Sequence, residues 1–246
     1  MILASLSSSP RRLATVGLVA WLVAACAVPV SAPTPSPTPM PTIPAPGPAY
    51  TLGPTPGDCP TTAPAAMAAG STATVTMTTN FGTIVIKADG SLGANAAGAF
   101  VALARCGYYN NVLFHRIVVT PKKFVIQAGD GQYARLPSLE PDKWGQGGPS
   151  WTIPDDKVTT KYVRGTVAVA RKGGQDNSGS TQFFIVLDNS AQDSLGATTA
   201  NNYAIIGTVT SGMDVVDKIA AVPLGGDNGD MPLQAVVITG TTVTTP

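Results

Sequence analysis

From Thr72 to the C-terminus, short runs of alternating apolar and polar residues dominate the chain. Such period-two runs, rich in Val, Ile and Thr, predict β-strands. The runs TATVTMTT (72–79) and FGTIVIKAD (81–89), separated by Asn80, predict a hairpin. Further strands are predicted at 112–119, 123–128, 165–170, 182–187, 203–209 and 233–239.

Two segments have a helical rather than a strand period. Over 95–106 apolar residues recur on one face, and Gly107 follows as a residue that tolerates the left-handed geometry of a helix end. A second helix is predicted over 213–221, and loops over 130–161 and 188–201. Short strands with two isolated helices lack the strand–helix alternation of parallel sheets. A mainly β, closed antiparallel barrel is therefore predicted.

The first 25 residues are typical of an export signal. Two arginines precede the apolar stretch LATVGLVAWLVAA, which is shorter than the about 20 residues that a membrane-spanning helix needs. Val23-Ala24-Ala25-Cys26 resembles the bacterial lipoprotein box, in which the cysteine is acylated and becomes the first mature residue. We predict a lipoprotein signal over 1–25 and lipidation of Cys26; an ordinary cleaved signal and an uncleaved anchor are the alternatives.

The segment 26–70 is predicted to be a disordered tether rich in Pro, Thr and Ala. Residues 29–64 hold 13 of the 22 prolines and almost no charge. Such a composition buries too little apolar surface to offset its ordering entropy, and it favours extended polyproline II conformations. The expected organisation is a signal, a tether and one folded domain over 71–246. A lipid would anchor this domain on the extracytoplasmic face of a membrane.

Charge gives no indication of a nucleic-acid partner. The chain has 15 basic and 14 acidic residues, and loss of Arg11 and Arg12 with the signal leaves 13 basic ones. The sequence has no basic run, so binding to nucleic acid is not expected.

Two cysteines remain beyond Cys26, namely Cys59 and Cys106. An even pair in an exported protein predicts a disulfide, and two free buried thiols are the alternative. The single histidine, His115, and these cysteines show no metal-ligand spacing, so neither a metal nor another cofactor is expected.

The candidate chemistry lies in the two runs FHRIVVTPKKFVIQAGD and TQFFIV. Gln127 follows Val125 by two positions, and Phe184 follows Gln182 by two. Because side chains alternate faces along a strand, each pair places one amide and one apolar side chain on the same face. With Arg116 in the first run, a guanidinium, two amides and several apolar groups could converge on one shallow patch.

These runs resemble the cyclophilin family of peptidyl-prolyl cis/trans isomerases, and the resemblance covers roughly residues 72–240. The matching blocks follow in the family's order: YYNNVLFHRIV, FVIQAGDG, GQGGPSWTIPDD, RGTVAVAR, NSGSTQFFIVL, YAIIGTVTSGMDVVDKI and LQAVVITG. The resemblance implies an eight-stranded antiparallel closed barrel with an α-helix over each end. It also implies isomerisation of X–Pro bonds in unfolded or exported proteins, by a monomer without a cofactor.

Roles for single residues follow from the matching blocks. Arg116 matches the family's catalytic arginine, Gln127 the glutamine that orients it, and Gln182 a glutamine that contacts the substrate backbone. His115 is assigned to shaping the substrate groove, because isomerisation needs no proton transfer. The remaining candidates are the proline-pocket residues Phe124, Val125, Phe184 and Leu195, the rim residue Tyr203, and Ala170 and Arg171 along the substrate backbone. Phe183, on the opposite face of its strand, is assigned to the core.

The chain departs from the family pattern in its loops, and two other function classes are open. The loop VVTPKK and the 188–201 loop are longer than usual, and Ser194 occupies a position that is tryptophan in many eukaryotic members. This weakens any expectation of tight cyclosporin binding. One alternative is a catalytically weak peptide-binding module, which the presence of Arg116 and Gln127 disfavours. The other is a hydrolase with His115 as base, which the absence of a G-x-S-x-G elbow disfavours.

Overall fold

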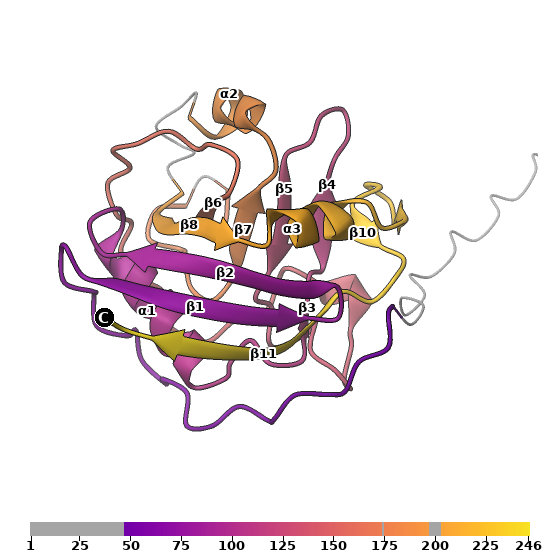
Figure 1. The fold of residues 1–246 in the computed structure, drawn as a ribbon, viewed down its shortest axis with the longest axis horizontal. Helices are drawn as coiled ribbons and strands as arrows, with labels where there is room; N and C mark the ends of the chain where they lie inside the picture. Colours follow the sequence, from indigo (N-terminus) through magenta and orange to yellow (C-terminus); the bar gives the residue numbers. More distant parts are fainter. Residues whose placement is uncertain (1–46, 174, 197–202) are drawn as a thin grey trace, which may run out of the picture. The chain divides into compact units, whose positions relative to one another are not determined.

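A computed structural model of the chain describes residues 47–173, 175–196 and 203–246. Its main strands are β1 (Thr72–Thr79), β2 (Gly82–Asp89), β3 (Val112–Leu113), β4 (Arg116–Val118), β5 (Val125–Ala128), β6 (Thr166–Val169), β7 (Phe183–Val186), β8 (Ile205–Ser211) and β11 (Val237–Thr244). These nine strands form one antiparallel sheet in the order β3-β11-β1-β2-β8-β6-β7-β5-β4 (Figure 1). Two further short strands, β9 (Leu224–Gly225) and β10 (Met231–Pro232), form a separate hairpin.

The helices agree with prediction except around residue 190. The structure has α1 (Ala94–Arg105), α2 (Gln192–Leu195) and α3 (Met213–Ala220), with 3-10 turns η1 (Pro141–Lys143) and η2 (Asn189–Ala191). The left-handed φ of +76° at Gly107 ends α1 as expected. η2 and α2 lie where a loop was predicted, and a backbone N–H bonded to the Asp188 carboxylate starts η2. Within the described residues, no helix is both long and apolar enough to cross a membrane.

The sheet curls, but its ladders do not confirm the closed eight-stranded barrel that was expected. β3 and β4 lie at the two ends of the strand order. Only Phe114 and His115 separate them along the chain, and the N–H groups of these residues donate to different partners, Val236 O (2.9 Å) and Gln127 O (3.1 Å). The expected strand 112–119 therefore breaks in two, because the chain changes from one partner segment to another at this point.

The last strand was placed wrongly. It was predicted at 233–239, whereas β11 spans Val237–Thr244 and pairs with β1. Leu233 belongs to the β9–β10 hairpin instead, where its N–H donates to Pro223 O at 2.8 Å. The threonines of β11 weaken its apolar pattern, so the strand was not predicted over its full length. β-branched residues nevertheless suit a half-exposed strand well.

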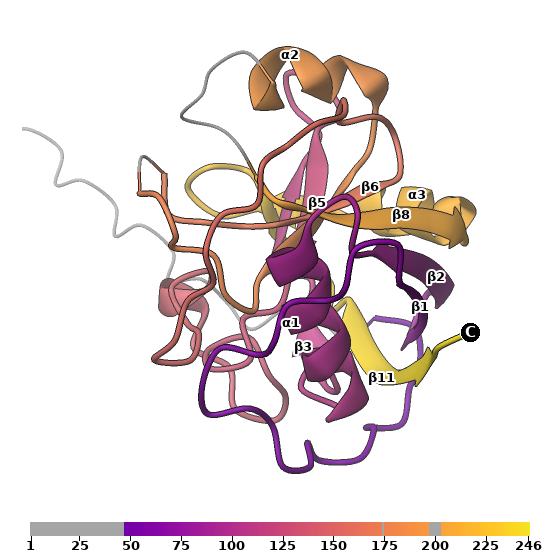
Figure 2. The same ribbon diagram turned by 90° about the vertical axis from the view of Figure 1, so that its left-hand side faces the viewer.

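The main core lies on the inner face of the curled sheet, beside α1 and α3 (Figures 1 and 2). Ile126 of β5 and Phe183 of β7 belong to it and are completely buried, which confirms Phe183 as a core residue. The Phe183 ring lies 5.2 Å from Phe100 of α1, centroid to centroid. Because neighbouring strand residues face opposite sides, Gln127 and Phe184 lie on the outer face.

The folded unit extends N-terminally beyond the boundary expected at residue 71. Residues 47–70 contain no helix or strand, but hydrogen bonds attach them to the domain. Gly57 N–H donates to Cys106 O and Met67 N–H to Ala94 O, both at 2.8 Å. The Trp151 indole donates to Pro60 O at 3.1 Å. In the same region, a disulfide joins Cys59 to Cys106 with a Cα–Cα distance of 5.3 Å.

Candidate active site

Strand register places the predicted polar residues in one row on the outer face of the sheet. Arg116 of β4 pairs with Gln127 of β5, and Gln127 pairs with Phe184 of β7. Phe184 pairs in turn with Ala168 of β6. Since directly opposite residues have Cβ atoms about 5 Å apart, ordinary antiparallel pairing is enough to bring these side chains together.

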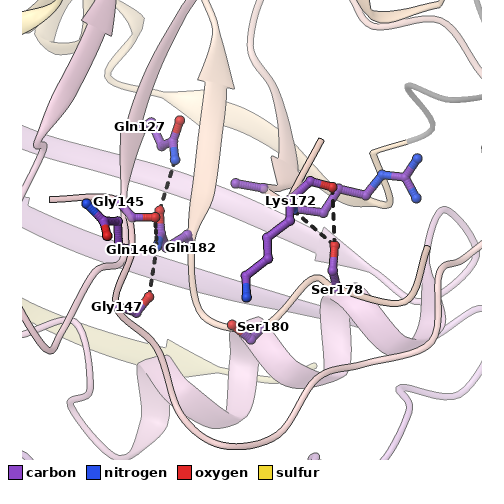
Figure 3. A pocket seen from close by; sticks show the side chains of 10 residues that line it. Gln127, Gly145, Gln146, Gly147, Lys172, Ser178, Ser180 and Gln182 are labelled. Carbon is purple, nitrogen blue, oxygen red and sulfur yellow. Dashed lines mark hydrogen bonds between the residues drawn. The ribbon is translucent and has the colours of Figure 1, made fainter. Parts of the chain in front are cut away.

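A chain of side-chain hydrogen bonds runs along this row. Arg116 Nη1 donates to Gln127 Oε1 (3.3 Å), and Gln127 Nε2 donates to Gln182 Oε1 (2.9 Å). Gln182 Nε2 then donates to the carbonyls of Gly145 (3.0 Å) and Gly147 (2.9 Å), as Figure 3 shows. Each amide oxygen accepts and each amide nitrogen donates, so the network fixes both glutamine orientations. The guanidinium is thereby linked to the 145–147 loop.

An apolar cluster beside the row contains all four residues predicted to hold the proline ring. Val125, Phe184 and Leu195 are nearly buried within it, and Phe124 is partly exposed at its edge. The predicted rim residue Tyr203 also contacts the cluster, with its ring edge-on to Phe184 at 5.3 Å. Side chains as distant in sequence as Phe124 and Tyr203 therefore form one apolar cluster.

A pocket of about 130 Å³ opens next to the amide network (Figure 3). Its lining consists of Gln127, Gly145, Gln146, Gly147, Ala170, Arg171, Lys172, Ser178, Ser180 and Gln182. Ala170 also contacts the apolar cluster, and its N–H donates to Gln182 O at 2.8 Å. The pocket and the cluster are therefore adjacent.

Arg171 lines this pocket, but its side chain is only 3% exposed and is held by carboxylates. Its Nη1 is ion-paired with Asp155 and with Asp176, and its guanidinium lies 5.9 Å from the Tyr203 ring centroid. Because Asp155 and Asp176 hold the guanidinium, the predicted contact with a substrate backbone would have to come from the main chain at this position.

His115, which was predicted to shape the substrate groove, is buried rather than exposed at it. A side chain added at Gly145 would come within 3.5 Å of its Nε2, so the imidazole lies beneath the 145–147 loop. Burial lowers the pKa of His115 to about 4; the Asp130 carboxylate opposes this shift and the Arg116 charge adds to it. The neutral ring supports the loop from below.

Sequence reasoning missed Asp130, which holds this loop. Its carboxylate, which is fully buried, accepts backbone hydrogen bonds from Gln132 (3.2 Å), Tyr133 (2.9 Å), Gly145 (2.8 Å) and Gly147 (3.1 Å). Four donors around one carboxylate make a rigid support for the carbonyls that bind Gln182. An acidic residue between two glycines directly after a strand was the available signal.

Asp230 was also missed. It accepts a hydrogen bond from Arg116 Nε at 2.8 Å, although the two residues are 114 positions apart. Nothing in the local pattern around GGDNGDMP connects it to the site. Among the described residues, no group of three or more His, Cys, Asp or Glu side chains gathers as a metal site would require.

Comparison with known proteins identifies the family of this chain. The family described as cyclophilin type peptidyl-prolyl cis-trans isomerase/CLD matches residues 74–243. Peptidyl-prolyl cis-trans isomerase B of Escherichia coli (strain K12) is 34% identical over 175 residues, which cover 69% of this chain and 98% of the relative. Peptidyl-prolyl cis-trans isomerase cyp18 of Streptomyces antibioticus is 32% identical over 173 residues, or 68% and 95% of the two chains.

Solved structures agree with this result. A cyclophilin type peptidyl-prolyl cis-trans isomerase of Cryptosporidium parvum superposes with a TM-score of 0.55 at 25% identity, over 71% of this chain and 99% of that one. A structure of the same enzyme in the presence of the dipeptide Ala-Pro gives a TM-score of 0.54 at 24% identity and supports the fold. The matched region contains the whole row from Arg116 to Phe184, so the chain belongs to the cyclophilin-type family of peptidyl-prolyl cis-trans isomerases.

Proposed function

We propose that the chain isomerises X–Pro bonds by binding the proline ring in the apolar cluster and stabilising the twisted amide with Arg116. Rotation about an X–Pro bond faces a barrier of about 18–20 kcal/mol, because resonance keeps the amide planar. In the twisted state resonance is lost, and the prolyl nitrogen becomes pyramidal with a lone pair. A donor beside that nitrogen stabilises the twisted state more than either planar isomer, and this lowers the barrier.

The observation that carries this proposal is the placement of a half-exposed guanidinium in the same strand row as the apolar cluster. The Arg116 side chain is 42% exposed, so a substrate can reach it, while Gln127 holds it in place. Donors that are fixed before the substrate arrives need no reorganisation during the reaction. No covalent bond forms or breaks, so neither a nucleophile nor a proton-transfer group is needed.

Substrate recognition follows from the two surfaces that continue from the guanidinium across β5, β7 and β6. Phe124, at the exposed edge of the apolar cluster, offers an apolar contact to the proline ring, and the Gln182 amide together with the main chain at Ala170 lines the adjacent polar pocket along which an extended peptide would lie. The Ala-Pro dipeptide named for the Cryptosporidium parvum structure supports proline-containing peptides as ligands. We expect the clients to be X–Pro segments of unfolded exported proteins.

Replacement of Arg116 by alanine tests the mechanism. Loss of a donor used mainly in the twisted state predicts a fall in turnover of about a hundredfold or more. Exchange spectroscopy on an Ala-Pro peptide measures the rate, and circular dichroism confirms folding. Arg105→Ala, which removes an exposed arginine at the end of α1, is the matched control and should keep wild-type turnover.

Two outcomes would contradict the proposal. Turnover of Arg116→Ala within threefold of wild type would remove Arg116 from the mechanism. A wild-type protein that binds the peptide without accelerating its exchange would favour the alternative, a catalytically weak peptide-binding module.

We also propose that the protein is an exported lipoprotein, anchored through Cys26 on the extracytoplasmic face and monomeric. The signal-like residues 1–25 and the lipoprotein box support this, and they lie outside the described residues. Palmitate labelling of the full-length protein should be lost in Cys26→Ser and kept in Cys59→Ser. Labelling that survives in Cys26→Ser would rule out this anchor. Light scattering of a lipid-free form tests for the monomer.

A further inference from the structure

The Arg116 guanidinium has a second partner besides Gln127. Asp230 Oδ2 accepts from Arg116 Nε at 2.8 Å, a shorter contact than the 3.3 Å from Nη1 to Gln127. The Asp230 side chain is 23% exposed. Solvent therefore screens this ion pair less than it screens an exposed pair such as Lys218–Asp214, whose side chains are 61% and 71% exposed. The contact joins two ionised groups through a directed hydrogen bond, which is a strong class of interaction.

The backbone fixes Asp230 at this position. Ile117 N–H donates to the Asp230 carbonyl at 2.7 Å, so the aspartate lies next to β4 at the residue that follows Arg116. β10 begins immediately after Asp230 and pairs with β9. A hydrogen bond from Leu233 N–H to Pro223 O (2.8 Å) continues the pairing at the base of the hairpin. The carboxylate is therefore presented by an anchored hairpin.

Asp230 and Gln127 bind different nitrogens of the Arg116 guanidinium. A guanidinium offers five N–H donors in one rigid plane. Asp230 binds the Nε donor and Gln127 binds one donor of Nη1. In the described parts of the chain, no hydrogen bond engages Nη2. Two contacts on different nitrogens fix the orientation of the plane, and the Nη2 donors remain for a substrate.

We propose that Asp230 is a positioning residue for the isomerisation. It acts through Arg116 by holding Nε, and so limits the guanidinium to the orientation in which the remaining donors meet the twisted amide. This inference rests on the role proposed for Arg116. Because an acceptor at Nε is the essential requirement, asparagine should replace aspartate better than alanine does.

Three variants test this. Asp230→Ala should lower kcat about tenfold with KM near the wild-type value, since one charge-assisted hydrogen bond is lost. Asp230→Asn should keep most of the wild-type kcat. Asp227→Ala, which removes an exposed carboxylate from the same hairpin, is the matched control and should behave as wild type. Should Asp230→Ala not fold, Asp230→Ser, whose shorter side chain cannot reach Nε, serves in its place.

Two further measurements separate positioning from a structural role. In an Arg116→Ala background, Asp230→Ala should cause no further loss of kcat. The Nε–H resonance of Arg116 should move and broaden in Asp230→Ala but not in Asp227→Ala. If Arg116→Ala is impaired while Asp230→Ala keeps the wild-type kcat and resonance, this inference alone is overturned. If Arg116→Ala keeps wild-type turnover, the proposed mechanism fails.

Discussion

The imidazole of His115 is buried beneath the site and remains neutral at pH 7, because burial holds its pKa at about 4. In the unfolded chain the same ring titrates near pH 6.5. Between these two values the unfolded state binds a proton that the folded state does not, so stability falls as pH falls. The loss begins near pH 6.5 and reaches about 3 kcal/mol near pH 4.

Since the chain has one histidine, this prediction can be measured directly. The His115 ring resonances should not titrate between pH 8 and 5, and the free energy of unfolding of His115→Gln should depend less on pH over 6.5–4 than that of wild type. Denaturant unfolding at several pH values, on both proteins, cancels the contribution of carboxylates. A ring titration near 6.5 in the folded protein would contradict the prediction.

Single residues of the site were predictable where a strand period places them. The offsets of Gln127 from Val125 and of Gln182 from Phe184 predicted a common outer face, and the register brings the two strands together. Asp230 was not predictable in this way, because its contact with Arg116 depends on where a distant hairpin folds back. The period of a strand predicts which face a residue occupies, but it does not predict which side chain of a distant loop contacts that residue.

At the scale of elements, the 145–147 loop depends on one carboxylate. Asp130→Asn replaces an acceptor oxygen by an NH₂ group that faces backbone donors, such as those of Gly145 and Gly147. We expect a loss of about 3 kcal/mol in the free energy of unfolding. We also expect weaker peptide binding, because Gln182 loses its fixed carbonyl partners.

Chemical denaturation and peptide titration measure the two effects. Asp142→Asn, which changes an exposed carboxylate in the same stretch, should alter neither. Unchanged peptide affinity in a folded Asp130→Asn variant would show that the loop does not support the site.

Elements with strong local signals were predicted, and those defined by tertiary contacts were not. The hairpin of β1 and β2 and the helices α1 and α3 have clear periods, and each was predicted to within about two residues. The predicted position of β11 was wrong because its threonines carry little apolar signal and because its position depends on pairing with β1. The break between β3 and β4 depends on two partner segments that are distant in sequence.

For the whole molecule, the Cys59–Cys106 disulfide connects the N-terminal segment to the end of α1. The bond closes a loop over 47 positions, which the chain-entropy model values at about 4 kcal/mol. Neither cysteine belongs to β4, β5 or β7, the strands that carry the row with Arg116. We therefore expect reduction to lower the melting temperature and to leave the turnover of the folded protein unchanged.

Calorimetry and exchange spectroscopy with and without reductant check this, and a Cys59→Ala/Cys106→Ala variant excludes effects of the reductant itself. Two thiols that alkylate freely in the unreduced exported protein would contradict the bond. Loss of turnover in the folded double variant would show that the segment influences the site.

The extent of the folded unit was hardest to predict, because proline-rich composition alone indicates an extended chain. Residues 47–70 form no helix or strand, so their backbone N–H and carbonyl groups are left to bond to the domain. Donors such as the Trp151 indole bind these carbonyls one at a time. Docking of this kind depends on the shape of the finished domain, and within residues 47–70 only the disulfide predicted at Cys59 pointed to it.

β5 and β7 bear the core on one face and Gln127 and Phe184 on the other, so these strand residues of the site cannot unfold without the core. Amide protons of these paired strands exchange with solvent only when the ladder between them opens. The specific activity per folded molecule should then show no decline of its own as temperature rises, until global unfolding begins. In evolutionary terms, a change at the outer face risks the fold itself, so new specificities are more accessible through the loops around it.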